Sequence, residues 1–129
     1  MKYIVTGGAG FIGSYLVERL LRNKSNEIVI LDNLSTGRLE NISKFKNIKF
    51  IKCDLSKKEN FWIKQFKNVD CVFHLAALAD IVPSINFPKK YYKSNVDGTF
   101  NIIEAWEKFA VIINIVLGLS VYLFIYLVF

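Results

Sequence analysis

The sequence predicts an α/β protein built on a parallel, doubly wound sheet, and three observations lead to this prediction. Short runs of β-branched and aromatic residues alternate with helical patterns over residues 1–108. A turn with glycines at a spacing of three lies between the first run and the first helix, and the second run ends at an acidic residue. Strands separated by crossover helices pair in parallel with right-handed connections, so we expect the strand order 3-2-1-4.

Four runs have the composition of buried strands. They are Lys2–Thr6, Glu27–Leu31, Ile48–Cys53 and Asp70–His74. The first helix is expected over about Phe11–Asn23, with Ile12, Leu16 and Leu20 on one buried stripe. A long last helix is expected over about Tyr91–Lys108.

Shorter helical segments are expected between the second, third and fourth strands. One lies within Arg38–Phe45. Ser56 and Glu59 have the spacing of a capping box, which predicts a helix that runs to about Phe66. A loop that contains both prolines of the sequence is expected before the long last helix.

The glycine turn has the features of a phosphate cradle. Gly7, Gly10 and Gly13 follow the first strand, and glycine lets backbone N–H groups approach a ligand closely. The helix that begins there adds the positive end of its dipole, which favours a pyrophosphate. A P-loop for nucleoside triphosphates is a poor fit, because Ser14 and Tyr15 stand where that motif requires Lys and Ser or Thr.

The acid at the end of the second strand, Asp32, lies roughly 20 residues after the last glycine, where a dinucleotide-binding carboxylate meets the adenosine ribose. The same negative charge would repel a 2′-phosphate, which favours NAD over NADP as the cofactor. Arg38, six residues further on, keeps NADP as the alternative. The sequence therefore predicts a dinucleotide site that prefers NAD.

Five motifs occur in one order along the chain. They are Thr6–Ser14, Asp32–Gly37, Cys53–Leu55, His74–Ala77 and Asn95–Thr99. Together they resemble the NAD-dependent epimerase/dehydratase family, the extended short-chain dehydrogenases that act on nucleotide sugars. The resemblance covers about residues 1–106 and implies a partial Rossmann fold.

The resemblance implies roles in NAD binding for sixteen residues. The pyrophosphate would be held by Gly7, Gly10 and Gly13 with the amides of Phe11 and Ile12. The adenosine ribose would meet Asp32 and Asn33, in a loop completed by Ser35, Thr36 and Gly37. The adenine would lie between Asp54 and Leu55, and the path to the nicotinamide would be lined by Leu75, Ala76 and Ala77, with Asn95 close to the cofactor.

The resemblance further implies that the full-length family binds a nucleotide sugar, a UDP-sugar above all. A homodimer of the full-length protein is compatible with the resemblance. The family's chemistry uses a tyrosine with a lysine four residues later, beyond the fifth strand. No Tyr-x-x-x-Lys occurs in this sequence; Tyr15 has Arg19 at that spacing, inside the first helix. We therefore predict no catalytic residue and no metal site in this chain, and expect a truncated NAD-binding part that is inactive alone.

The sequence divides into an NAD-binding domain over 1–108 and an apolar tail over 109–129 that contains no charged residue. As a helix, the tail is long enough to cross a bilayer and would anchor a nucleotide-binding module without catalysis. The alternative, favoured by the abrupt end of the motif series, is a reading-frame shift near codon 109. Within the tail, Val111–Val116 would also suit a fifth strand.

The formal net charge of +6 comes from scattered lysines, which favours a solvated surface over a nucleic-acid partner. The cluster from Lys89 to Lys93 suits either an anionic substrate or a solvated helix start. His74, the single histidine, ends an apolar strand, which favours a structural role. Cys53 and Cys71 lack C-x-x-C spacing and suit a reducing compartment, so a cytoplasmic protein is expected unless the tail anchors it.

Overall fold

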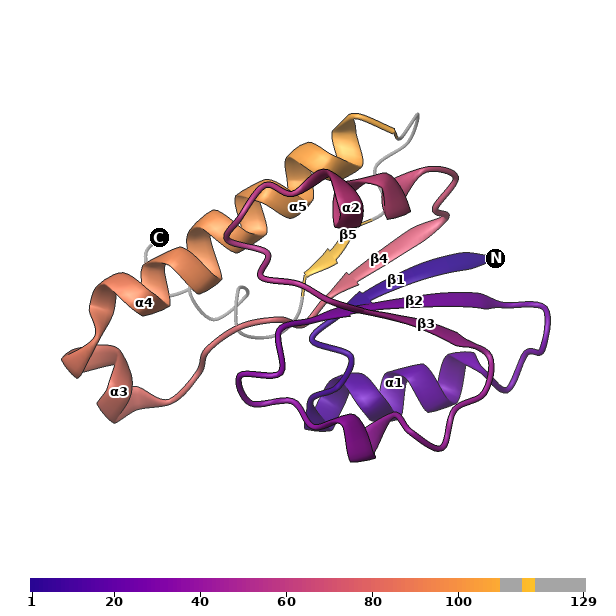
Figure 1. Ribbon diagram of the computed structural model, residues 1–129, viewed down its shortest axis with the longest axis horizontal. Helices are drawn as coiled ribbons and strands as arrows, with labels where there is room; N and C mark the ends of the chain where they lie inside the picture. The colour runs from indigo at the N-terminus through magenta and orange to yellow at the C-terminus, as the bar shows by residue number, and fades with distance from the viewer. Residues whose placement is uncertain (110–114, 118–129) are drawn as a thin grey trace.

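A computed structural model describes residues 1–109 and 115–117 of the chain. Its centre is a parallel sheet with the strand order β3-β2-β1-β4-β5 (Figure 1). The strands are β1 (Lys2–Thr6), β2 (Glu27–Asp32), β3 (Ile48–Lys52), β4 (Cys71–His74) and β5 (Ile115–Leu117). The predicted fold class and the order 3-2-1-4 are confirmed, and β5 adds a fifth strand beside β4.

The central strand is β1, which pairs in parallel on both sides. Tyr3 lies opposite Ile28 of β2 and opposite Cys71 of β4. β2 continues the sheet to β3, and β4 continues it to β5. Because every pair is parallel, the carboxyl ends of all strands lie at one edge of the sheet, which is where α/β proteins of this kind bind ligands.

Helices cover both faces of the sheet: α1 lies on one face, and α2 and α5 lie on the other (Figure 1). The α-helices are α1 (Phe11–Leu20), α2 (Asn60–Ile63), α3 (Ile81–Asn86), α4 (Pro88–Tyr92) and α5 (Gly98–Glu107). The other helical turns are η1 (Leu39–Asn41), η2 (Lys64–Phe66) and the π-helical η3 (Lys93–Asp97).

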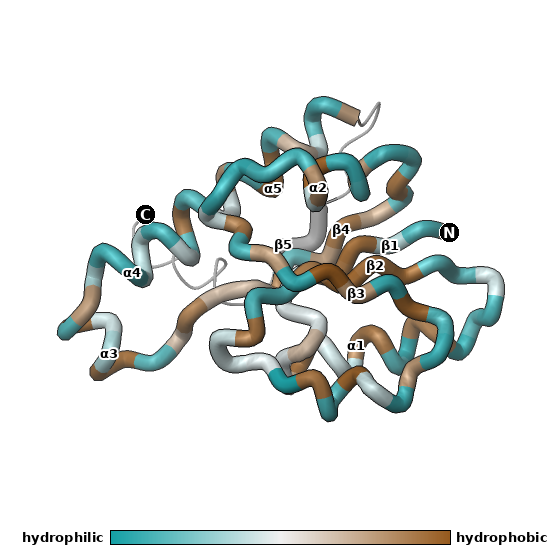
Figure 2. Tube along the Cα trace, in the orientation of Figure 1, coloured by the Kyte–Doolittle hydropathy of each residue, from teal (hydrophilic) through white to brown (hydrophobic). Residues whose placement is uncertain are grey.

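Two apolar cores result, one on each face of the sheet, because side chains of successive strand residues point to opposite faces. Ile4 packs with Trp62 and Trp106 under α2 and α5, whereas its neighbour Val5 packs with Val17 under α1. In Figure 2 the middle of the sheet is largely brown, whereas the loops and helices carry both teal and brown segments. Burial of both sheet faces explains why the strands read as continuous apolar runs.

Three details of the helices differ from the sequence predictions. α1 ends at Leu20, before the predicted end, and Ile12 is 63% exposed instead of buried in the stripe. The capping box does not form: the hydroxyl of Ser56 donates to Asp54, and α2 begins later, with Glu59 at its N-cap and no side-chain cap bond. The predicted proline-containing loop holds the short helix α3.

The predicted long last helix is one continuous helix with a local defect. α4, η3 and α5 follow one another without a break, and the five residues of η3 form a π-helix. Beside this π-turn, the hydroxyl of Thr99 donates a hydrogen bond to the backbone carbonyl oxygen of Asn95 at 2.6 Å. Single π-turns inside α-helices occur often at functional sites, and this one lies beside the pocket described below.

Most of the predicted tail lies outside the described residues. Of the segment 109–129, the structure describes only Phe109 and β5, so the membrane-helix and frame-shift interpretations both concern residues outside the described ranges. Of the predicted strand Val111–Val116, only the last two residues are described, and both belong to β5. Within the described ranges, no helix combines the length and the apolar character needed to span a membrane.

Candidate functional site

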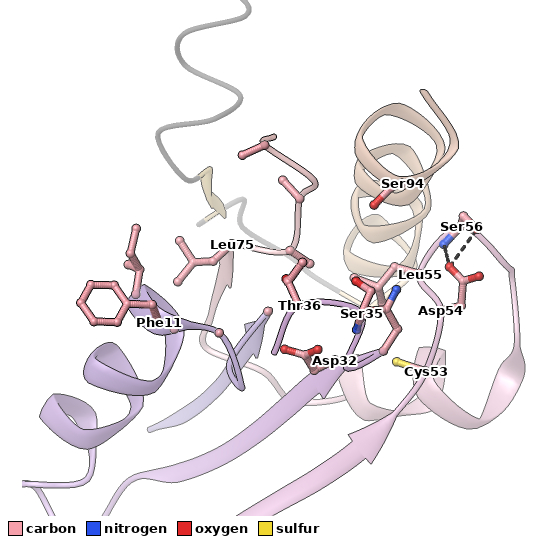
Figure 3. A pocket seen from close by; sticks show the side chains of 18 residues that line it. Phe11, Asp32, Ser35, Thr36, Cys53, Asp54, Leu55, Ser56, Leu75 and Ser94 are labelled. Carbon is pink, nitrogen blue, oxygen red and sulfur yellow. Dashed lines mark hydrogen bonds between the residues drawn. The ribbon is translucent and has the colours of Figure 1, made fainter. Parts of the chain in front are cut away.

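A pocket of about 360 Å³ opens where the loops after β1, β2, β3 and β4 meet. Most of the predicted site residues line it. They are Gly7, Gly10, Phe11, Ile12, Gly13, Asp32, Asn33, Ser35, Thr36, Asp54, Leu55, Leu75, Ala76 and Ala77. In Figure 3, Phe11 lies at the start of α1 on one side, Asp32 lies on the floor, and Asp54 and Ser56 lie on the opposite side.

The glycine turn packs tightly against its neighbours. Gly7 has φ +68°, in the left-handed region that glycine adopts without steric cost. A Cβ atom on Gly7 would lie 2.8 Å from the backbone nitrogen of Ala76, and one on Gly13 would lie 2.2 Å from the Gly7 carbonyl oxygen. The absence of side chains at these two positions therefore lets β1, α1 and the segment after β4 approach one another.

The first turn of α1 offers unpaired hydrogen-bond donors to the pocket. Gly10 N–H donates to Gly7 and Ser14 N–H donates to Gly10, both at 3.0 Å. Within the described part of the chain, the backbone N–H groups of the three residues between them, all of which line the pocket, have no partner. Such a helix start binds anions through its free N–H groups and the positive end of its dipole.

Asp32 anchors the floor of the pocket. Its carboxylate accepts the N–H of Ala9 at 3.0 Å and that of Leu34 at 2.8 Å, and the residue is only 7% exposed. One bond fixes the glycine turn, and the other fixes the loop after β2, where Leu34 adopts a left-handed backbone with φ 60°. Each carboxylate oxygen keeps a further lone pair, so Asp32 can also accept hydroxyl groups from a ligand.

The loop after β3 forms the far wall. Oδ1 of Asp54 accepts both the N–H (3.1 Å) and the hydroxyl (2.8 Å) of Ser56. Leu55 is buried, and its carbonyl oxygen accepts the side-chain amide of Asn101 from α5 at 2.8 Å. These bonds hold an acidic and an apolar side chain in fixed places at the end of β3.

His74 links β1, β4 and the long helix through a directed chain of hydrogen bonds. Because the Thr99 hydroxyl donates to Asn95, its oxygen accepts the Nε2–H of His74 at 2.9 Å. Nδ1 of the neutral ring is then an acceptor, and Thr6 donates to it at 2.6 Å. This arrangement assigns the Nε2–H tautomer to the ring.

The same chain fixes the pocket wall after β4. The Thr6 hydroxyl oxygen accepts the backbone N–H groups of Leu75 and Ala76, each at 3.2 Å. His74 is 2% exposed, and this burial lowers the pKa of its imidazole to about 4. The neutral, fully bonded ring has the structural role that the sequence favoured, since it cannot exchange protons with a ligand near pH 7.

Two of the predicted site residues do not line the pocket. Gly37 lies close to the glycine turn and to Asp32, because a Cβ atom on it would stand 3.0 Å from Ala9 and from the Asp32 carboxylate. The Asn95 side chain is engaged with Leu78, whose N–H and carbonyl oxygen it bonds at 2.8 Å each. Both residues therefore shape the loops around the pocket.

Four lining residues were not among the predicted site residues. They are Cys53, Ser56, Ala79 and Ser94. Cys53 already belongs to the Cys53–Leu55 motif, although no site role was given to it, and extending that motif by one residue would have included Ser56. Ser94 comes from the π-helical turn and points from the helix towards the pocket (Figure 3). Nothing in the local sequence around Ser94 signals a π-helix.

Cys53 is expected to resist alkylation in the folded protein. Burial first, and the charges of Asp32, Glu59 and Asp54 next, raise the pKa of its thiol to about 12. The thiolate is the reactive form, so at pH 8 roughly one thiol in ten thousand would be ionised. Iodoacetamide labelling read by mass spectrometry should leave Cys53 unmodified until denaturant is added; rapid labelling without denaturant would contradict the described burial.

Comparisons with known proteins agree with the family resemblance. A family model described as the NAD dependent epimerase/dehydratase family matches residues 3–123. UDP-glucose 4-epimerase of Bacillus subtilis is 40% identical over 117 residues, which is 86% of this chain and 34% of that protein. UDP-glucuronic acid decarboxylase 6 of Arabidopsis thaliana is 38% identical over 106 residues, 80% of this chain and 29% of that protein.

A solved structure agrees with the sequence matches. The crystal structure of Thermus thermophilus UDP-glucose 4-epimerase in complex with NAD superposes with a TM-score of 0.73 at 38% identity. The match covers 84% of this chain and 34% of that one. The chain therefore spans about a third of the length of the relatives it matches.

Proposed function

Because this chain belongs to the NAD-dependent epimerase/dehydratase family, we propose that its pocket is the NAD-binding site of a nucleotide-sugar enzyme. One observation carries the proposal: the loops after four parallel strands bring all but two of the residues assigned to NAD into one pocket. These loops are distant in sequence, and an accidental glycine turn would not gather the other motifs around it. The pocket also lies at the strand ends where this fold class binds nucleotides.

The donors and acceptors of the pocket fit a dinucleotide. The free N–H groups at the start of α1 suit the pyrophosphate, and the Asp32 carboxylate on the floor suits the ribose hydroxyls. Ala76 and Ala77 form a low wall that a flat ring can approach. NAD, when bound, supplies a carbon that accepts a hydride; the residues described here bind and orient it.

We propose a UDP-sugar as the substrate of the complete enzyme. The relatives named above act, by their names, on UDP-glucose or UDP-glucuronic acid. The Tyr-x-x-x-Lys pair on which the family's chemistry relies is absent from this sequence. We therefore propose that this chain alone holds NAD without turning over a sugar, and that catalysis requires the part of the family's length it does not span.

Replacement of Asp32 by asparagine tests the proposed site. Asparagine keeps one acceptor oxygen, so its NH2 group faces one of the two N–H donors, Ala9 or Leu34, and it lacks the charge that strengthens bonds from ribose hydroxyls. A hydrogen bond to a charged group contributes about 1.5–3 kcal/mol, so the Kd for NAD should rise by roughly one to two orders of magnitude. Isothermal titration calorimetry measures it directly.

Asp70 offers a matched control for this variant. Its carboxylate also accepts a backbone N–H, that of Lys2 at 2.6 Å, but it precedes β4 at the opposite edge of the sheet. Asp70→Asn removes the same charge and should leave the Kd for NAD unchanged. Equal Kd values for wild type and Asp32→Asn, with both proteins folded by circular dichroism, would show that the ribose site lies elsewhere.

A further inference from the structure

The long helix formed by α4, η3 and α5 carries a line of apolar side chains on its outer face. Tyr92, Val96 and Phe100 follow one another at a spacing of four residues and are 40–60% exposed. Residues four apart lie on one face of an α-helix, and the wider π-turn of η3 keeps this spacing in line. Ile103, three residues after Phe100, is half-buried and extends the line. We call these four residues the apolar stripe.

The apolar stripe is separate from the face of the helix that packs on the sheet. Ile102, Ala105 and Trp106 of α5 are buried in the core on the other side. The α4 end of the helix extends beyond the sheet (Figure 1). The outer face of such a helix normally carries polar residues, and large apolar groups gathered there are typical of a surface that contacts another macromolecule.

The charges beside the stripe are segregated along the helix. Lys89, Lys90 and Lys93 are exposed near its start, whereas Glu104 and Glu107 lie near its end. The helix dipole favours the reverse order, with acids near the start and cations near the end. Within the described part of the chain, neither Lys89 nor Glu107 forms an ion pair. The placement of these charges therefore gains nothing within one copy of the chain.

Two further lysines reduce the negative charge at the end of the helix. Lys58 pairs with Glu104 and lies over the ring of Phe100, 5.6 Å from its centroid. Lys108 lies at the C-cap of α5. Glu107, which is exposed, is therefore the acid that a cation from outside can reach.

A second copy of the chain fits both the stripe and the charges when the two helices run antiparallel. With a two-fold axis at the level of Gly98, Val96 of one copy lies against Phe100 of the other. The same axis brings Lys89 of each copy opposite Glu107 of the other, so unlike charges meet at both ends. A parallel pair would instead place lysine against lysine and glutamate against glutamate.

We propose that the chain forms a homodimer through the apolar stripe, with the two long helices antiparallel and Lys89 of each copy paired with Glu107 of the other. The surface lies outside the pocket, so the dimer does not depend on the proposed NAD site. The helix spans residues 88–107 and is about 30 Å long. One pair of such helices buries less than the roughly 1,200 Å² of a standard interface, so we expect a weak dimer.

The variant Val96→Glu tests the stripe. Val96 is partly exposed, so the fold should tolerate a glutamate that would meet Phe100 of the second copy. In analytical ultracentrifugation of the full chain, the wild type should be mostly monomeric at about 1 µM and mostly dimeric at about 100 µM. Val96→Glu should be monomeric at both concentrations, with an unchanged circular dichroism spectrum.

Leu39→Glu is the matched control. Leu39 is 48% exposed in η1, a turn held beside the glycine turn by bonds of Arg38 and Asn41 to Ala9. This variant also replaces an exposed apolar residue by an acid, and it should dimerise like the wild type. A wild-type chain that is monomeric at 100 µM, or a dimer that persists in Val96→Glu, would overturn the proposal.

An exchange of charges tests the antiparallel arrangement and leaves the stripe intact. Lys89→Glu and Glu107→Lys should each weaken the dimer about tenfold, because like charges then meet at both ends. The double variant Lys89→Glu/Glu107→Lys restores unlike charges and should bind within about threefold of the wild type. The two residues are roughly 25 Å apart along one helix, so this recovery cannot arise within one copy. A double variant as weak as either single variant would contradict the antiparallel pairing.

Discussion

Replacement of Gly13 by alanine is expected to abolish NAD binding and to lower the free energy of unfolding by about 3 kcal/mol. The new Cβ atom would stand 2.2 Å from the Gly7 carbonyl oxygen and 2.7 Å from the Gly8 Cα atom. Both obstacles are backbone, so no side-chain rotation relieves the overlap. The glycine turn and the first turn of α1 must move apart, which displaces the free N–H groups of α1 that we propose to hold the pyrophosphate. Chemical denaturation and calorimetry with NAD measure the two effects.

Gly98→Ala provides the control on the other long helix. A Cβ atom there would lie 3.7 Å from Leu55 Cβ, an ordinary van der Waals contact. Since alanine favours the helix by about 1 kcal/mol over glycine, this variant should be as stable as the wild type or more stable. If Gly13→Ala behaved like Gly98→Ala in both measurements, the close packing described for the turn would be wrong.

The second large effect is a loss of stability in weak acid that depends on His74. Burial lowers the pKa of this imidazole from 6.5 in the unfolded chain to about 4 in the folded one. Between these values the folded state binds fewer protons, so stability is fully present above pH 6.5 and falls as the pH drops towards 4. The loss amounts to about 3 kcal/mol. Denaturant melts across pH 4–7.5 measure it.

The single histidine of the chain allows a direct control. Its imidazole C2 proton should titrate in NMR spectra with a midpoint far below 6.5 in the folded protein and near 6.5 in denaturant. The His74→Gln variant lacks the imidazole and keeps every carboxylate. The free energy of unfolding of this variant should therefore fall less steeply over the same pH range than that of the wild type. A folded-state midpoint near 6.5 would contradict the burial that the hydrogen-bonded chain implies.

Much of the fold was predictable because its signals are local. β1 has the predicted bounds, Lys2–Thr6, and the strand order follows from alternating strands and helices. Asp32 could be assigned from its sequence distance to the glycines, because the glycine turn and Asp32 belong to the same βαβ unit, and both line the pocket. The family resemblance drawn from five motifs is confirmed by the family model.

The errors concern individual side chains whose contacts a periodic pattern or a motif spacing does not determine. Ile12 fits a buried helical stripe, yet it is exposed at the rim of the pocket. Ser56 has capping-box spacing, but Asp54 is nearer and takes its hydroxyl. Ser94 reaches the pocket from a π-turn of the long helix, and no local pattern encodes that turn.

The contact between Gly7 and the segment after β4 has a consequence for how a ligand arrives. No methyl group fits between Gly7 and Ala76, and both are tied to the paired central strands β1 and β4. Neither can swing aside unless the middle of the sheet separates. This part of the pocket wall is therefore ordered before a ligand binds. The entropy cost of ordering it belongs to folding, so it does not reduce the binding affinity.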